Sequence, residues 1–355
     1  MASTVRAGVI GFGLGGKIFH APFLHHIDGF ELAAIFERHG DDAAKAYPAV
    51  PIVRSMQELL ALPELALVVV TTPPATHFEL ARQCLEAGKH VVIDKPFTPT
   101  SDQARQLIQL AHTSGLVLSA YQNRRWDGDF LTLKKLIADG ELGRVASLES
   151  RFERYHPGPR PKKWQEKNVP GNGLLHDLGS HLADQALVLF GTPQAVTADI
   201  RYDRDLTAVN DGFDVHLHYP RLRVSLYSTL IAPAPGPRFV AHGTGGSYIK
   251  YGLDPQESAL KSGATLGSPG WGEEPQSAWG KLTRIENGAP VERIVPTLPG
   301  DYRPYYENVR DAILGRAPLA VPGEQGWRVV RLLEIAIESS VRGKTIPCGE
   351  LDAMA

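Results

Sequence analysis

The sequence predicts a doubly wound α/β domain of parallel strands, followed by an α+β domain with a mainly antiparallel open sheet. Three observations support this prediction. Short apolar runs alternate with helical segments from residue 4 to about 122. A glycine-rich turn follows the first apolar run, and from Ala195 onward several strand patterns follow one another without helices between them. We therefore expect two domains, residues 1–122 and 123–355, in a chain of 355 residues that is long enough for both.

The first element is a buried parallel strand, Val5–Ile10, which ends at the motif G-x-G-x-x-G formed by Gly11, Gly13 and Gly16. The first glycine permits a sharp turn, the second lets a pyrophosphate approach the backbone, and the third allows the next helix to pack closely. The N-terminus of that helix offers unpaired N–H groups to the phosphates. Between a strand and a helix, this motif is typical of a dinucleotide-binding Rossmann domain, and a tight turn without a ligand is the alternative.

The second strand, Phe30–Phe36, ends at two opposite charges, Glu37 and Arg38. Glu37 lies 21 residues after Gly16, near the position that contacts the adenosine ribose in dinucleotide folds. A carboxylate there accepts hydrogen bonds from a ribose 2′-OH, which favours NAD, whereas an arginine pairs with a 2′-phosphate, which favours NADP. The sequence therefore predicts NAD or NADP without deciding between them, and two solvated charges at a strand end are the alternative.

The third strand, Leu67–Val70, ends at Thr72 and Pro73, because proline cannot continue a central strand. Thr76 is expected to cap the next helix, which begins at His77.

A fourth strand begins at His90 and ends at Asp94, Lys95 and Pro96. A lysine at the carboxyl end of a parallel strand points towards the crevice in which α/β folds bind ligands. A helix and then a strand within residues 101–120 complete the predicted parallel unit.

The second half begins with a predicted helix over 129–138 and a weakly alternating strand over 145–152. The next segment, from Tyr155 to Trp164, is rich in proline and basic residues. It fits either a solvated surface loop or a wall of a substrate site, since aromatic and basic groups suit a polyol or sugar.

A helix that starts near Leu174 carries Asp177 and His181 at positions i and i+4, which share one helix face. An acid/base pair needs this geometry, but an ordinary structural hydrogen bond has it too. A metal site formed by His176 with these two residues is a further alternative, and we expect no metal.

Strand patterns over 195–230 and a hairpin over 239–251 predict an antiparallel sheet. A partly apolar open face of this sheet would be a natural interface for a homodimer or homotetramer. Residues 252–280 show no periodicity and are predicted to form a long loop, and two amphipathic helices are expected over 302–314 and 323–341.

The overall composition excludes several classes of protein. Hydrophobic residues are 43% and charged residues 21%, which is ordinary for a globular protein. A net charge of −2 gives no general attraction to nucleic acid or to an anionic membrane. Two cysteines make neither a disulfide framework nor a zinc site, and a strand from Val5 leaves no room for a signal peptide. With no apolar run long enough to span a membrane, we expect a cytoplasmic protein.

These motifs together resemble the Gfo/Idh/MocA oxidoreductase family, which includes glucose–fructose oxidoreductase and inositol dehydrogenase. The matching positions are Gly11, Gly13 and Gly16 with His20 and Pro22, Thr72 and Pro73 with His77, Asp94-Lys95-Pro96, and Asp177 with His181. Asp94 stands where the family usually has Glu, and the lysine after it is kept. The likeness covers essentially the whole chain and looks closest to the branch that includes NADP-dependent scyllo-inositol dehydrogenases.

The resemblance implies an NAD(P)-dependent oxidoreductase that acts on a secondary alcohol or ketone of a sugar or cyclitol. It implies that His181 takes the hydroxyl proton, that Lys95 polarises the reacting oxygen, and that Asp177 orients the substrate or His181. A keto-sugar reductase and a catalytically silent cofactor-binding regulator of the same fold are the alternatives.

The remaining site residues are also expected from this likeness and from their places in the chain. The expected cofactor-binding residues are Gly11, Phe12, Gly13, Gly16, Lys17, Glu37, Arg38, Thr72, Pro73, His77, Asp94, Lys95, Pro96 and Asn123. The expected substrate-binding residues are Arg124, Trp126, Tyr155 and Trp164, although Arg124 equally suits an ion pair between the two domains.

Overall fold

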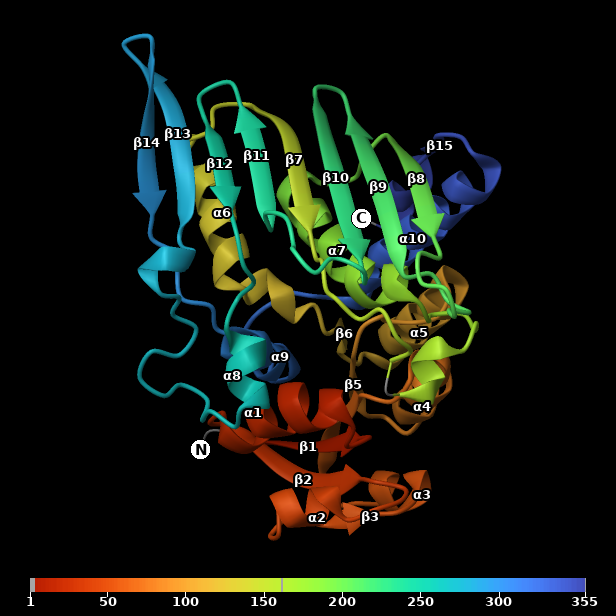
Figure 1. The fold of residues 1–355 in the computed structure, drawn as a ribbon. Helices are drawn as coiled ribbons and strands as arrows, with labels where there is room; N and C mark the ends of the chain where they lie inside the picture. Colours follow the sequence, from red (N-terminus) through yellow and green to blue (C-terminus); the bar gives the residue numbers. More distant parts are fainter. Residues whose placement is uncertain (1–3, 161, 355) are drawn as a thin grey trace. The chain divides into compact units, whose positions relative to one another are not determined.

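The computed structural model describes residues 4–160 and 162–354, so Pro161 in the proline-rich segment lies outside the described residues. The chain forms two compact units, whose elements are labelled in Figure 1. Unit 1 comprises the chain up to Asn123 together with Glu257–Pro269 and Tyr302–Trp327. Unit 2 comprises Arg124–Gln256, Gly270–Asp301 and the chain from Arg328 onward. Unit 1 therefore includes two segments beyond the range 1–122.

Unit 1 is built on a six-stranded parallel sheet of order β3-β2-β1-β4-β5-β6. The strands are β1 Val5–Ile10, β2 Phe30–Phe36, β3 Ile52–Val53, β4 Leu65–Val70, β5 His90–Ile93 and β6 Leu118–Ala120. The strand order reverses between β1 and β4, which confirms the predicted Rossmann fold. The central strands are apolar because both of their faces are buried, as the fully buried Val68, Val69 and Val70 show.

Helices connect these strands and complete unit 1. They are α1 Ala21–His26, α2 Asp42–Ala46, α3 Met56–Leu60, α4 His77–Glu86, α5 Ser101–Ser114, α8 Gln256–Lys261, α9 Arg303–Ile313 and the start of α10 Gly323–Arg342. The prediction that Thr76 caps α4 is wrong, because a 3₁₀ turn, Pro74–Thr76, runs straight into this helix. The Thr76 hydroxyl instead donates to the carbonyl oxygen of Pro73 at 2.8 Å.

Unit 2 is built on a nine-stranded mixed sheet of order β14-β13-β12-β11-β7-β10-β9-β8-β15. The strands are β7 Val145–Arg151, β8 Ala195–Arg201, β9 Gly212–Tyr219, β10 Leu222–Thr229, β11 Phe239–Gly243, β12 Ser247–Lys250, β13 Gly280–Glu286, β14 Ala289–Val295 and β15 Ile346–Pro347. Only β7 and β10 pair in parallel, so the predicted mainly antiparallel sheet is confirmed.

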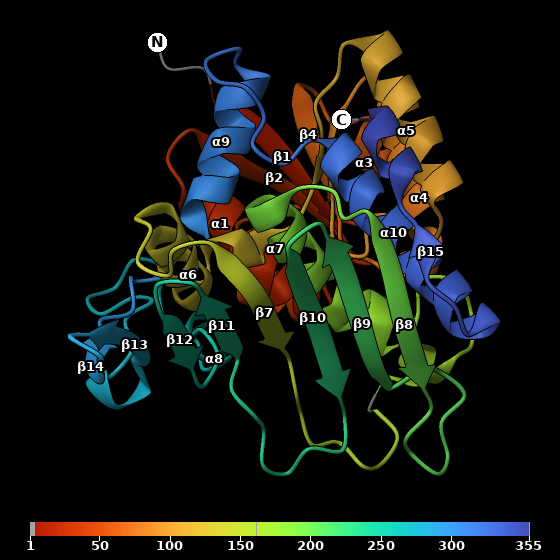
Figure 2. The ribbon, with the colours of Figure 1, turned by 90° about the horizontal axis from the view of Figure 1, so that it is seen from above.

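One face of the unit 2 sheet is covered by helices and the other is open, as Figure 2 shows. The covering helices are α6 Gly128–Ala138, α7 Ser180–Phe190 and the larger part of α10. Alternation along the strands matches this arrangement, because Leu217 and Val224 are buried while the neighbouring His216 and Ser225 on the open face are half-buried.

The long loop predicted over 252–280 is only partly a loop. It contains α8, and it is followed by the hairpin of β13 and β14, which the sequence analysis did not predict. Most residues of β14 are exposed, so the strand has no apolar alternation that would reveal it.

Asp254 is a buried carboxyl of unit 2 that should make the stability of the protein depend on pH. It accepts hydrogen bonds from the backbone N–H groups of Gly128 and Gln256 at 2.7 and 2.9 Å. Burial, together with the charge of Asp129, raises its pKa to about 6 from 3.8. A raised pKa means that folding favours the protonated form, so the contribution of Asp254 is complete below pH 3.8 and is lost as the pH rises through about 6.

We therefore expect Asp254→Asn to gain stability relative to the wild type as the pH rises from 4 to 6.5. The relative gain is up to about 3 kcal/mol, from roughly two pKa units. We also expect a difference in the free energy of unfolding that does not vary with pH, since the amide has one acceptor oxygen where the carboxylate has two. Denaturation midpoints of both proteins across this pH range measure the difference, and parallel curves would contradict the prediction.

Among the described residues, no helix combines the length and the apolar character needed to cross a lipid bilayer.

Candidate active site

A first group of candidate residues lies in unit 1, where the carboxyl ends of three adjacent strands meet. In the parallel sheet β1, β4 and β5 are neighbours, so the segments that follow them share one edge. These segments carry Gly11, Thr72 and Lys95, respectively. The structure thus brings together the three predicted motifs of the first domain.

The glycine turn has the shape that a dinucleotide pyrophosphate needs. Gly11 has a φ of +95°, which side chains disfavour, and a Cβ on Gly16 would overlap the carbonyl oxygen of Gly11. A Cβ on Gly13 would meet nothing within 4 Å, so the backbone is open at the position where a phosphate approaches. The residues present therefore fit this group, and Lys17 is exposed just after the turn. Phe12, by contrast, is buried and packs edge-on against Tyr47.

His77 connects the segments after β4 and β5. Its ring is buried, with Nε2 at 2.7 Å from the carbonyl oxygen of Thr72 and Nδ1 at 2.9 Å from that of Pro96. Burial lowers its pKa despite the charge of Asp94 and the surrounding carbonyl groups. Because both ring nitrogens contact backbone oxygens, His77 holds the segments after β4 and β5 together. Direct contact of His77 with a cofactor stays a prediction.

Asp94 is held beside the glycine turn. Its Oδ1 accepts the backbone N–H of Lys95 at 2.7 Å, and a Cβ on Gly15 would approach its Oδ2 to 2.7 Å. Burial raises its pKa, but the neighbouring His20, whose Nε2 lies 3.6 Å from Oδ2, and the charge of Lys95 outweigh burial, so the pKa lies below its ordinary value. His20 is fixed in turn by Tyr306 of α9, whose hydroxyl lies 2.5 Å from Nδ1.

The Glu37 side chain is buried and engaged with the start of α2. It is 8% exposed, and its Oε2 accepts the backbone N–H of Ala43 in α2 at 3.2 Å. Arg54 closes the turn over it, with Nη1 at 2.8 Å from the Glu37 carbonyl oxygen and 2.6 Å from that of Gly40. Arg38 is exposed next to this closed turn. Arg54 could not be recognised from the sequence, because it lies 17 residues after Glu37 and belongs to no motif.

Two further residues that were predicted to bind the cofactor follow strands β4 and β6 of the same sheet within three residues. Pro73 is exposed and begins the turn after β4, while Asn123 is buried at the start of a 3₁₀ turn, Asn123–Trp126. Their cofactor contacts stay predictions.

A second group of candidate residues lies in unit 2, on a helix whose first residues are hydrogen-bonded to Asn210. The backbone N–H of Leu174 donates to the Asn210 carbonyl oxygen, and that of Leu175 donates to Asn210 Oδ1. A π-helical turn, Leu175–Gly179, then leads into α7. π-Helical turns often occur at functional sites. Asp177 lies in this turn and His181 in the first turn of α7, so the predicted pair spans the junction.

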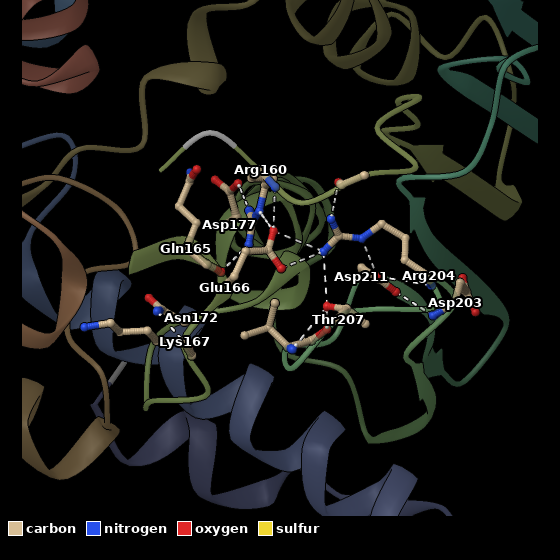
Figure 3. A network of polar contacts seen from close by, with 12 residues as sticks. Arg160, Gln165, Glu166, Lys167, Asn172, Asp177, Asp203, Arg204, Thr207 and Asp211 are labelled. Atoms are coloured by element: carbon tan, nitrogen blue, oxygen red, sulfur yellow. Dashed lines mark hydrogen bonds and ion pairs between the residues drawn. The ribbon is translucent and has the colours of Figure 1, made fainter. Parts of the chain in front are cut away.

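The exposure of the predicted pair differs. The Asp177 side chain is 34% exposed, whereas His181 is 3% exposed. Arg160, from the proline-rich segment, lies 3.4 Å from Oδ2 of Asp177 through Nη1, as Figure 3 shows. The sequence indicated a basic loop here, but it carried no signal that Arg160 in particular reaches this carboxylate.

The predicted substrate residues of unit 2 have different surroundings. Arg124 is buried, pairs with Asp127 at 3.3 Å and lies over the ring of Phe152. Tyr155 is 56% exposed, and Trp126 and Trp164 are half-buried. This ion pair of Arg124 lies within unit 2, so it does not test the alternative of an interdomain pair, and substrate binding by the four residues stays a prediction.

A metal was the alternative role for His176, Asp177 and His181. His176 is buried, with Nδ1 at 3.0 Å from the Asn172 carbonyl oxygen, and burial lowers its pKa. Within the part of the chain that the structure describes, no three His, Cys, Asp or Glu side chains are grouped so that they could hold a metal ion.

Both halves of the chain match one protein family. Residues 5–122 match its part described as "Oxidoreductase family, NAD-binding Rossmann fold", and residues 134–348 match "Oxidoreductase family, C-terminal alpha/beta domain". These two ranges cover most of the chain.

Individual relatives match over nearly their whole length. The oxidoreductase YdgJ of Escherichia coli, described as uncharacterized, is 45% identical over 98% of this chain and 99% of its own. The scyllo-inositol 2-dehydrogenase (NADP(+)) IolW of Bacillus subtilis is 39% identical over 97% of this chain and 96% of its own. Among solved structures, the YvaA protein of Bacillus subtilis is 38% identical, with a TM-score of 0.92 over 98% of this chain and 99% of its own.

Proposed function

Because this chain belongs to the Gfo/Idh/MocA oxidoreductase family, we propose that it is an NAD(P)-dependent dehydrogenase of sugars or cyclitols. It would transfer a hydride between nicotinamide and a secondary alcohol, or the corresponding ketone in the reverse direction. The observation that carries the proposal is the place of Lys95, directly after β5 at the sheet edge that also carries the glycine turn. The relative named as a scyllo-inositol 2-dehydrogenase supports the substrate class.

In the proposed reaction, residues of this chain move the proton. A bound nicotinamide would supply the hydride acceptor, and Gly11, Gly13 and Gly16 would hold its pyrophosphate. His181 takes the proton of the substrate hydroxyl, as suits a group whose ordinary pKa lies near neutrality. The Lys95 ammonium group stabilises the negative charge that develops on the same oxygen. Asp177, one turn before His181, orients the imidazole or a second substrate hydroxyl.

We propose that the cofactor is NADP rather than NAD. The Glu37 carboxylate, which would select NAD, accepts the backbone N–H of Ala43 at the N-terminus of α2, and Arg54 donates to the carbonyl oxygens of Glu37 and Gly40. Arg38 is exposed beside Glu37 and suits a 2′-phosphate, since guanidinium groups bind phosphate through paired hydrogen bonds. The relative IolW is named as an NADP(+) enzyme, which agrees with this preference.

The open face of the unit 2 sheet is the proposed contact between copies of the chain. Its register places Val240 beside Ile249, and Lys281 beside Ile294, on one face. Ile294 is 50% exposed and Val240 and Ile249 are half-buried, and accessible apolar side chains beside a charged residue are typical of a subunit interface. A homodimer or homotetramer assembled through this face is the expected form.

A screen of inositols, other polyols and aldoses, with both cofactors and in both reaction directions, tests the proposed activity. We expect cofactor-dependent turnover of at least one cyclic polyol or its ketone, followed by absorbance of the reduced nicotinamide. Lys95→Ala is the control for contaminating enzymes and should abolish the signal. If the pure protein binds a cofactor but turns over no compound in either direction, the proposal fails in favour of a cofactor-binding regulator.

A further inference from the structure

Five charged side chains of unit 2 form a continuous row of alternating sign that ends on Asp177 (Figure 3). In order they are Asp211, Arg204, Glu166, Arg160 and Asp177. The successive nitrogen–oxygen distances are 2.6, 3.0, 3.3 and 3.4 Å. The row connects a turn before β9, through the proline-rich segment, to the π-helical turn of the predicted catalytic pair.

Burial makes this row different from ordinary surface ion pairs, which contribute little to stability. Arg204 and Asp211 at its base are 3% and 1% exposed, and Arg160 and Glu166 are 11% and 18% exposed. Burial raises the pKa of Glu166. Hydrogen bonds from the Arg160 backbone and from Arg204, together with the charges of both arginines, lower it by more, so the pKa lies below its ordinary value. The middle of the row is therefore ionised at neutral pH.

The orientation of the Arg160 guanidinium is set by the segment that carries it. Its Nε donates to Glu166 at 3.3 Å, its Nη2 donates to the Gln165 carbonyl oxygen at 2.7 Å, and its Nη1 faces Asp177. The segment is fixed as well, because Arg204 Nη1 donates to the carbonyl oxygen of Gly158 at 2.7 Å. With its other nitrogen atoms engaged, Arg160 presents a fixed edge to the Asp177 carboxylate.

We propose that Arg160 is a positioning residue of the reaction, which holds the Asp177 carboxylate ionised and in one orientation beside His181. The inference rests on the proposed function, since it gives Asp177 a role in the chemistry. It adds a group from the proline-rich segment, which the sequence marked only as a surface loop or a substrate wall. The segment then acts on the reaction through Asp177 rather than by contact with the substrate.

The direction in which the pKa of Asp177 would shift without the Arg160 charge follows from the neighbouring groups. Arg160 faces it from the proline-rich segment, His181 follows one turn later, and the adjacent His176 is neutral because burial lowers its pKa. A cation within hydrogen-bonding distance favours the carboxylate over the carboxyl. Removing the Arg160 charge should therefore raise the pKa of Asp177.

The kinetic test compares Arg160→Gln and Arg160→Lys with the wild type. For Arg160→Gln we expect the acidic limb of the kcat/KM profile to move to higher pH by up to about one unit, and kcat at its optimum to fall roughly tenfold. Lysine restores the charge without the paired hydrogen bonds, so Arg160→Lys should return the limb to lower pH and recover kcat only in part. Arg151→Gln is the matched control, because Arg151 also pairs with two carboxylates of unit 2, Glu149 and Glu153.

A second measurement is independent of turnover. Carboxyl ¹³C resonances of the cofactor-free protein, with Asp177 assigned by its loss in Asp177→Asn, report the titration of this side chain directly. A higher pKa of Asp177 in Arg160→Gln than in the wild type and in Arg151→Gln supports the inference. An unchanged titration, or equal changes in Arg160→Gln and Arg151→Gln, overturns it. If no substrate is found, the proposed function fails while this titration still decides the contact between Arg160 and Asp177.

Discussion

Replacing His181 by alanine is expected to lower kcat by about 10²- to 10⁴-fold, the range for loss of a general base. The affinity for the cofactor should stay within a few-fold, because His181 lies in unit 2 and the predicted pyrophosphate site lies in unit 1. Stopped-flow measurement of hydride transfer and fluorescence titration of the reduced cofactor separate the two quantities. The remaining rate should lose the pH dependence that His181 gives to the wild-type enzyme.

A buried histidine has structural roles too, so the test needs controls that a packing defect does not imitate. His112→Ala removes an exposed histidine of α5, away from the proposed subunit contact, whose described partner is Glu324, and should keep kcat. Added imidazole should restore part of the turnover of His181→Ala, since it replaces the base and not the fold. A kcat within a few-fold of the wild type in His181→Ala would rule out the assigned role.

The parallel half of the fold could be predicted because its signals are local. Buried central strands such as β4 are continuous apolar runs, and Gly11 and Gly16 are forced by backbone geometry within a few residues. β3 was missed because two residues are too few to show any periodicity. The segment of α9 could not be assigned to unit 1 from sequence, because its contact with His20 through Tyr306 joins residues 286 positions apart.

The hairpin of β13 and β14 was missed although a signal for it was present. Asn287 and Gly288 have φ values of 53° and 80°, the conformation of the two-residue turn for which Asn-Gly is the strongest sequence indicator. The flanking strands lack apolar alternation because most of their outer residues are exposed. The Asn-Gly dipeptide of the turn, rather than a hydrophobic pattern in the strands, would have predicted this hairpin.

The candidate site could be predicted as a set of residues but not as a set of contacts. The motifs marked Lys95, Asp177 and His181 by type and spacing. They carried no information on which way Glu37 turns or on which charge faces Asp177, because those outcomes depend on Arg54 and Arg160, each 17 positions from its partner. Both arginines act through backbone carbonyls as well as carboxylates, and such contacts leave no pattern in a single sequence.

The direction in which Glu37 turns leads to a prediction about cofactor selection. Wild-type protein should bind NADPH more tightly than NADH, and Arg38→Ala should weaken NADPH by about 10- to 100-fold while NADH changes little. This range corresponds to loss of charge-assisted hydrogen bonds of about 1.5–3 kcal/mol. Fluorescence titration of both reduced cofactors measures it, and the advantage of NADPH should shrink as salt is added. Arg82→Ala is the matched control, since Arg82 is a half-buried arginine of α4 that pairs only within its own helix among the described contacts.

Glu37→Gln separates the two roles that an acidic residue has at the end of β2. If the carboxylate contacted the ribose 2′-OH, this change would weaken NADH specifically. Because Oε2 instead accepts the Ala43 N–H at the start of α2, we expect both cofactors to bind within a few-fold of the wild type and stability to fall by about 1 kcal/mol. Arg54→Ala, which opens the turn around Glu37 and Gly40, should then weaken NADPH, since a released carboxylate beside Arg38 repels a 2′-phosphate. A protein that prefers NADH and loses that preference in Glu37→Gln would show that the carboxylate turns outward to the cofactor.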